Sequence, residues 1–88
     1  MIQVKLFGNL RSKVGQATVE ASGATIREVL FNLCATFPEL EKAIFDQDQL
    51  QSYVRVMING RDIELGQGLD SLVDESDQVA IFPPIAGG

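Results

Sequence analysis

Apolar and polar residues alternate near both ends of the chain, which is the pattern of strands with one buried face. Near the N-terminus the alternation covers residues 2–7, IQVKLF, and returns in residues 16–21, QATVEA, where Ala17 is one of the inward positions. The polar stretch between them is bounded by Gly8 and Gly15 and is interpreted as a loop. Two strands joined by a short loop predict an antiparallel hairpin.

A helical period follows this hairpin. Thr25 and Glu28 stand at the spacing of a capping box, in which two side chains satisfy backbone N–H groups of the first helical turn. The next apolar positions recur every three or four residues, as one buried helix face requires. They are Ile26, Val29, Leu30, Leu33, Cys34 and Phe37. Pro38 ends this run because it lacks a backbone N–H and restrains the residue before it.

The segment 38–45, PELEKAIF, predicts a second, shorter helix, because Pro38 is well placed in a first helical turn. Its expected core positions are Leu40, Ile44 and Phe45. The following residues, 46–52, are polar and are interpreted as a connector.

The second half of the chain predicts three more strands. Residues 53–58, YVRVMI, alternate, and the pair 59–60, Asn-Gly, is the strongest short hairpin signal because a type I′ turn needs positive φ at both positions. A short return strand is expected at Ile63 and Leu65. A turn-rich connection with Leu69 and Leu72 as anchors then leads to the last strand, QVAIF.

The resulting order, β-β-α-(α)-β-β-β, predicts an α+β fold of the β-grasp, or ubiquitin-like, type. In this fold a mixed sheet packs on one main helix, here with a short second helix. The first and last strands are expected to pair in parallel at the centre of the sheet, because the helical crossover supplies the necessary connection. A chain of 88 residues allows one small domain, so we expect a domain over 1–82 and a flexible C-terminal tail over 83–88.

The net charge of the chain limits the classes of molecule that it is expected to bind. A net charge of −5 argues against nucleic acid, whose recognition needs a basic stripe, and against anionic membrane surfaces. It favours protein partners with basic patches. No apolar run approaches the ~20 residues of a membrane span, and the alternating N-terminus lacks a signal-peptide core. We therefore expect a cytoplasmic protein.

The side chains available for chemistry are few. The chain has no histidine, which is the usual general base near neutral pH. Its one cysteine, Cys34, falls on the apolar helix face, where core packing is favoured over redox chemistry. The acidic residues Asp74, Glu75 and Asp77 lack the glycine-containing loop of a calcium site and are interpreted as a solvated turn. These features argue against a free-standing enzyme.

The uncovered face of the sheet is a candidate docking surface. Alternation places the following residues on it: Gln3, Lys5, Phe7, Tyr53, Arg55, Met57, Ala80 and Phe82. A solvated face is usually polar, so Phe7, Met57 and Phe82 together indicate partner binding. The alternative is that the loop 8–15 covers these side chains within the chain.

The chain also resembles a known family. The stretches that carry the resemblance are VKLFGNLRSKVG, TIREVLFNLCATFPEL, VRVMING and DESDQVAIFPPIAGG, which together span nearly the whole sequence. They are similar to the small subunit of molybdopterin synthase and its ubiquitin-like sulfur-carrier relatives. One departure is visible, since family members often carry Gly-Asp before the last strand, where this chain has Ser76-Asp77.

The resemblance implies that the terminal carboxylate of Gly88 is the working group. An E1-like partner would use ATP to convert it to an acyl-adenylate, and a persulfide donor would then leave a thiocarboxylate. The sulfur would pass to a pterin precursor on the large subunit of molybdopterin synthase, in an expected heterotetramer, for molybdenum or tungsten cofactor. The chain would bind no cofactor and no metal itself. The resemblance also implies that the loop residue Arg11 helps to meet partners.

The residue types of the tail fit this role. Gly87 and Gly88 keep the end narrow beside the reacting carbon and reach φ values that are closed to other residues. Pro83 and Pro84 favour extended geometry and reduce the conformational freedom that is lost when the tail enters a pocket. The six residues after Phe82 reach at most roughly 20 Å, which is enough to enter such a pocket.

Three alternatives remain open from the sequence. The sulfur acceptor could belong to thiamine or cysteine biosynthesis instead. Gly88 could become amide-linked to a lysine, which would make the chain a ubiquitin-like protein modifier. The chain could also be a binding module with an inert end.

Overall fold

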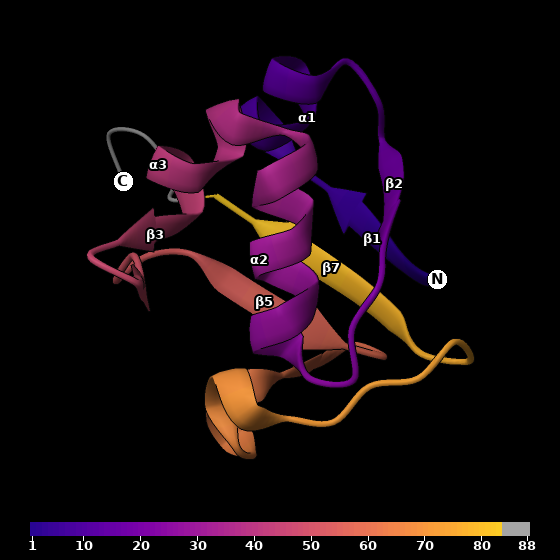
Figure 1. The fold of residues 1–88 in the computed structure, drawn as a ribbon. Helices are drawn as coiled ribbons and strands as arrows, with labels where there is room; N and C mark the ends of the chain where they lie inside the picture. The colour runs from indigo at the N-terminus through magenta and orange to yellow at the C-terminus, as the bar shows by residue number, and fades with distance from the viewer. Residues whose placement is uncertain (84–88) are drawn as a thin grey trace.

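A five-stranded mixed sheet forms one layer of the computed structural model, which describes residues 1–83 (Figure 1). In spatial order its strands are β2 (Thr18–Ala21), β1 (Ile2–Leu6), β7 (Gln78–Phe82), β5 (Arg55–Ile58) and β6 (Arg61–Asp62). β1 and β7 run parallel and the other pairs are antiparallel. The predicted parallel pairing of the first and last strands is therefore confirmed.

The helix α2 (Ile26–Thr36) crosses one face of this sheet (Figure 1). Its first turn is capped as predicted, because the Glu28 N–H donates to Thr25 Oγ1 at 3.3 Å. Glu28 Oε1 in turn accepts a hydrogen bond from the Ala24 N–H at 2.8 Å. The helix ends before Phe37, where Pro38 begins a 3-10 turn, η1 (Pro38–Leu40), followed by the short helix α3 (Glu41–Ile44).

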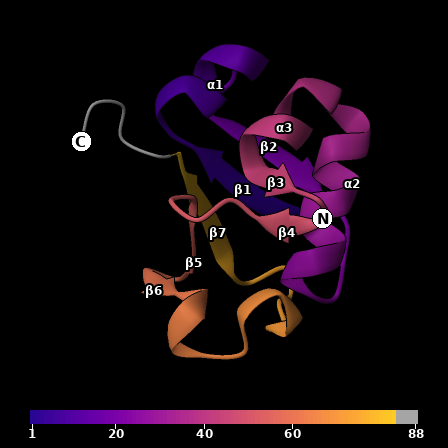
Figure 2. The same cartoon turned by 90° about the vertical axis from the view of Figure 1, so that its left-hand side faces the viewer.

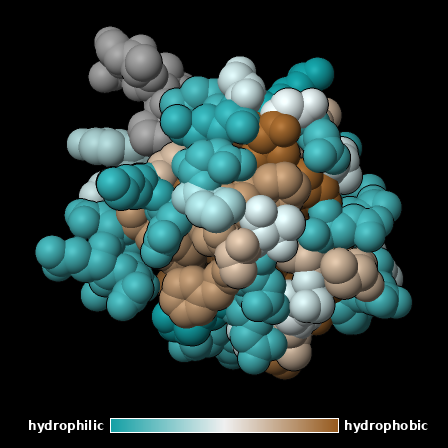
Figure 3. Space-filling model, turned by 45° about the horizontal axis from the view of Figure 1, so that its top comes forward, coloured by the Kyte–Doolittle hydropathy of each residue, from teal (hydrophilic) through white to brown (hydrophobic). Residues whose placement is uncertain are grey.

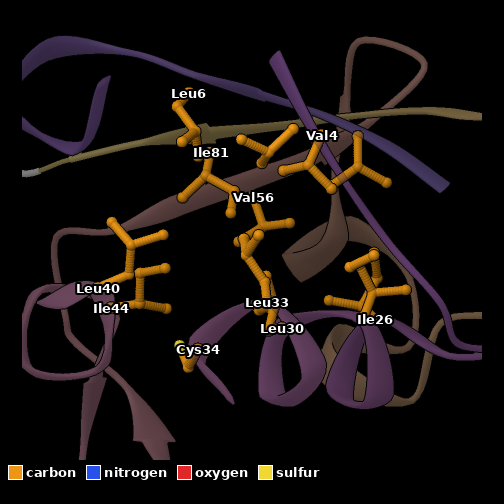
Figure 4. Packing of buried hydrophobic residues seen from close by; sticks show 14 of the residues in the cluster. Val4, Leu6, Ile26, Leu30, Leu33, Cys34, Leu40, Ile44, Val56 and Ile81 are labelled. Atoms are coloured by element: carbon orange, nitrogen blue, oxygen red, sulfur yellow. The ribbon is translucent and has the colours of Figure 1, made fainter. Parts of the chain in front are cut away.

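The hydrophobic core lies between α2 and the sheet (Figure 4). Leu30 and Leu33 point from α2 toward Val56 and Ile81 on the sheet. Leu40 and Ile44 close one end of this core, and both are fully buried, as the apolar pattern predicts. Within the described residues, no buried side-chain nitrogen or oxygen lacks a hydrogen-bond partner.

The segment after β1 is a helix, α1 (Gly8–Val14), so the predicted loop between Gly8 and Gly15 is wrong. Leu10 is fully buried and Val14 packs against the core, four residues further along the same helix face. Gly15 ends the helix with a φ of +82°, and its N–H donates to the Arg11 carbonyl at 2.8 Å. Two apolar side chains among polar ones were too few to indicate a helical period.

Three shorter predictions also need correction. The predicted connector at 46–52 is replaced by a small hairpin of β3 (Phe45–Asp46) and β4 (Gln49–Leu50). Phe45, predicted as the last residue of the short helix, is the first residue of β3 instead. The return strand stops at Asp62 and continues as a 3-10 turn, η2 (Ile63–Leu65), which leaves Leu65 exposed. A further 3-10 turn, η3 (Gly68–Asp70), follows.

Two apolar positions point differently from their predicted direction. Leu72 is 75% exposed and does not anchor the connection, because the neighbouring Val73 fills the core position. Ala17 is exposed and lies just before β2, which begins at Thr18; its carbonyl accepts a hydrogen bond from the Leu6 N–H at 2.9 Å.

The Asn59-Gly60 turn between β5 and β6 is confirmed, with φ values of +53° and +83°. The Asn59 side chain also holds the entry to β7, because it donates to Asp77 Oδ1 at 2.8 Å and accepts from the Gln78 N–H at 2.9 Å. Asp77 Oδ2 accepts from the Asp74 N–H at 2.9 Å. The turn with Ser76-Asp77 is therefore closed by side-chain hydrogen bonds.

We expect the Leu33→Ala substitution to lower the free energy of unfolding by about 2–5 kcal/mol, because it leaves a cavity in a fully buried site. That is a large part of the roughly 5–15 kcal/mol that stabilises a typical domain. Urea unfolding followed by circular dichroism measures the change. Leu72→Ala is the matched control, and because Leu72 is 75% exposed we expect its effect to stay within about 0.5 kcal/mol. Equal losses for both variants would contradict this assignment of the core.

Candidate partner-binding surface beside the C-terminal tail

Two aromatic rings stack where the last strand leaves the sheet. The rings of Phe7 and Phe82 lie 4.4 Å apart between centroids and 10° from parallel. The Phe7 N–H donates to the Ile81 carbonyl at 3.3 Å, which extends the pairing of β1 with β7 to this point. Figure 2 shows β7 reaching this end of the sheet below α1. The stack is therefore a fixed part of the domain at the base of the tail.

Pro83 continues from this stack along the start of α1. A Cβ added to Gly8 would lie 2.8 Å from Pro83 Cγ, so the proline ring packs directly against the glycine backbone. Gly8 also has a φ of +56°, which favours glycine. This contact joins residues 75 positions apart and helps to set the direction in which the chain leaves the domain. The sequence did not indicate it, since the only signal was a lone glycine after the first strand.

The strand register places further residues of the same face beside the stack. Arg55 pairs with Phe82 and Met57 pairs with Ala80 across β5 and β7. Lys5 pairs with Ala80 from the other side, across β1 and β7. Paired residues on neighbouring strands share one face of the sheet. We call this set the tail-side surface; its members are Lys5, Phe7, Arg55, Met57, Ala80, Phe82 and Pro83.

The tail-side surface is accessible in the described part of the chain. Phe7 is 39% exposed, and Met57 and Phe82 are half-buried. The alternative in which residues 8–15 cover these side chains is therefore wrong for Phe7, because α1 turns its buried Leu10 toward the core instead. Tyr53 was expected on the same face, but it lies in the turn before β5 and is 75% exposed.

Basic side chains border the apolar part of this surface. Arg55 Nη1 lies 3.4 Å from Asp62 Oδ2, but its side chain remains 58% exposed. Lys5 is exposed and makes no salt bridge with any described residue. Arg11 is exposed near the end of α1, on a helix and not on the predicted loop. The remaining predicted site residues, Pro84, Gly87 and Gly88, lie outside the described residues.

Cys34 lies in the core, as its position on the apolar helix face predicts. Cys34 is 9% exposed, and burial, reinforced by the nearby Glu41 carboxylate, raises the pKa of its thiol to about 11. The thiolate is the reactive form of cysteine, so this thiol stays protonated and inert near neutral pH.

The acidic turn before β7 is held by local hydrogen bonds. Ser76 donates to the Asp74 carboxylate through its hydroxyl and its N–H, which lowers the pKa of Asp74. A hydrogen bond from the N-terminal ammonium of Met1 lowers the pKa of Glu75. Among residues 1–83, no group of three or more His, Cys, Asp or Glu side chains is placed to hold a metal ion. No helix in that range is long and apolar enough to cross a membrane.

Comparison with known proteins gives consistent matches over nearly the whole chain. A model of the ThiS family matches residues 4–88. Small archaeal modifier protein 3 of Haloferax volcanii is 30% identical over 90 residues, covering 99% of this chain and 98% of that protein. Sulfur carrier protein CysO of Mycobacterium tuberculosis is 31% identical over 77 residues, and the match covers 84% of this chain and 83% of that protein.

Solved structures agree with the fold. A crystal structure of the Amycolatopsis orientalis BexX/CysO complex matches with a TM-score of 0.89 and 27% sequence identity, covering 100% of both chains. In that structure a similar protein is bound to a partner protein. The match confirms the β-grasp fold. Residues 1–83 contain three α-helices where the sequence predicted two. The chain belongs to the ThiS family, a family of ubiquitin-like sulfur carriers and modifiers.

Proposed function

We propose that this protein is a sulfur carrier, the small subunit of molybdopterin synthase, and donates sulfur from a thiocarboxylate at Gly88. The observation that carries the proposal is the junction of Phe82 and Pro83. There the last strand ends in an accessible aromatic stack, and the sequence continues into a tail that ends in two glycines. A partner that binds the tail-side surface would receive the chain end within the roughly 20 Å that the tail can span.

The chemistry follows from the poor reactivity of a carboxylate. Its negative charge repels nucleophiles, so an activating partner must first transfer AMP from ATP to the Gly88 carboxylate, with release of pyrophosphate. A persulfide sulfur then attacks the acyl carbon and expels AMP, and a thiol reduces the resulting acyl disulfide to the thiocarboxylate. The protein's own contribution is to bind and orient, and its partners carry out the activation and the transfer.

The charges of the tail-side surface indicate which side chains a binding partner should present to it. Lys5 and Arg55 flank the apolar residues on opposite strands of the face. A fitting partner surface would present apolar side chains to the Phe7–Phe82 stack and carboxylates to these two cations. Such rim charges mainly raise the rate of association and discriminate against partners of the wrong charge.

Intact mass of the purified protein tests the proposal. The protein is produced together with its activating enzyme and sulfur donor, and the mass of the whole chain is measured. We expect the replacement of one oxygen by one sulfur at the C-terminus. A chain that lacks Gly87 and Gly88 is the control and should keep its unmodified mass. An unmodified full-length chain under these conditions would overturn the sulfur-carrier proposal.

A protein modifier is the second candidate, and the likeness to a protein named as a small archaeal modifier favours it. Activation to the acyl-adenylate would be shared with the first candidate. The final acceptor would be a lysine amine, which forms an amide with Gly88. Higher-mass conjugates that disappear when the two terminal glycines are removed would support this candidate over the first.

The acceptor of the sulfur is the remaining choice within the first candidate. Thiamine and cysteine biosynthesis are alternatives to the pterin, and the likeness to a protein named CysO keeps the cysteine branch open. Transfer of radioactive sulfur from the thiolated chain to a pterin precursor, with the large subunit present, separates these branches. Transfer only to another acceptor would contradict the molybdopterin assignment.

A further inference from the structure

A second apolar surface lies on the side of α2 that faces away from the sheet. Phe31 is 40% exposed there, and its ring lies 5.1 Å from the ring of the buried Phe45. Figure 3 views the helix side from above and shows apolar side chains reaching the surface between polar ones. A large aromatic side chain that is exposed beside a buried one offers an anchor point for a second molecule.

A hollow of about 240 Å³ opens beside these rings. It is lined by Phe31, Cys34, Ala35, Glu41, Phe45 and Asp48. Of these residues Cys34 and Phe45 are buried, whereas Glu41 and Asp48 are exposed and place their carboxylates at the rim. The hollow has room for one large apolar side chain, but its acidic rim would repel an anionic ligand.

The charge around the hollow is concentrated and negative. Residues 39–48 contain four acidic residues and one lysine, a net charge of −3 out of the −5 of the whole chain. Asp48 is held at the rim by a two-residue turn in which Gln47 and Asp48 both have positive φ, at +52° and +66°. Asn-Gly is the usual choice for such a turn. The tail-side surface, by contrast, is bordered by Lys5 and Arg55.

We propose that this hollow binds a basic protein segment, with one large apolar side chain packed in the hollow against the rings of Phe31 and Phe45 and a lysine or arginine facing Glu41 and Asp48. This site is separate from the tail-side surface, since α2 and the core lie between the two. The protein can therefore be held through its helix side while its tail-side surface is bound to another partner. The proposal does not depend on what the C-terminus carries.

Selection from a random peptide library tests this site, with the full chain immobilised as bait. We expect enriched peptides to combine one large apolar residue with lysine or arginine close by. The best peptide is then synthesised and its Kd measured against the wild type and variants. We expect Phe31→Ser to raise this Kd at least about tenfold and Glu41→Lys to raise it and weaken its dependence on salt.

Matched controls separate this site from general loss of structure. Leu72→Ser removes another exposed large apolar side chain and Glu64→Lys makes the same charge change elsewhere, so both should leave the Kd unchanged. Thermal unfolding checks that each variant is folded. NMR shifts caused by the peptide should centre on the lining residues. The proposal is overturned if the selected peptides share an acidic consensus, or if the best peptide binds Phe31→Ser with the same Kd as the wild type. It is also overturned if the library yields no more enriched peptides on the wild type than on Phe31→Ser.

Discussion

The Phe82→Asp substitution is expected to weaken binding of the protein to its partner by about a hundredfold, which is the effect of losing a central interface residue. Phe82 stacks on Phe7 and lies between the strands that carry Lys5 and Arg55. A carboxylate there would be desolvated on binding without an apolar contact in return. Isothermal titration with the activating enzyme or the large subunit measures the change.

A control on the same strand makes this result specific. Gln78→Asp introduces the same charge on the same face of β7, four residues away from the stack, and should leave the affinity almost unchanged. The fold itself should survive Phe82→Asp, because the lost aromatic pair contributes only about 0.5–1.5 kcal/mol beyond its buried area. Unchanged affinity in a folded Phe82→Asp protein would remove this face from the binding site.

The Gly87→Ala substitution is expected to leave the fold intact and to slow thiocarboxylate formation by about a hundredfold. The physical reason is that the added methyl group lies on the residue next to Gly88, which carries the reacting carbon. A shift of about 1 Å in a reacting atom costs on the order of a hundredfold in rate. The time course of the sulfur-for-oxygen mass change, followed with purified activating enzyme, measures this effect.

The tail offers its own control for this second prediction. Ile85→Ala removes side-chain volume two positions earlier, so it does not widen the chain end and should be thiolated at close to the normal rate. If Gly87→Ala is thiolated as fast as the wild type, a narrow chain end is not what the activating site requires.

The sequence was enough to predict which residues belong to the candidate site, but not which of them contact each other. Alternation identified Phe7 and Phe82 as residues of one face, and the parallel pairing of their strands placed them near each other. The stacking of their rings and the packing of Pro83 against Gly8 depend on residues about 75 positions apart. No local pattern records such a contact. The same holds for the hollow beside Phe31, which exists only because the hairpin of β3 and β4 folds against α2.

The strands β1, β2, β5 and β7, the main helix and the Asn59-Gly60 turn were determined by the sequence itself. Each has a local cause: a period of two or 3.6, a capping pair, or a positive φ. The helix α1 was decided by the tertiary structure. A helix of seven residues is not stable in isolation, and α1 forms because the burial of Leu10 stabilises it. The sequence thus specified which faces are apolar, and only the packed fold determined which residues meet on them, since contacts across the chain depend on the arrangement of every element between them.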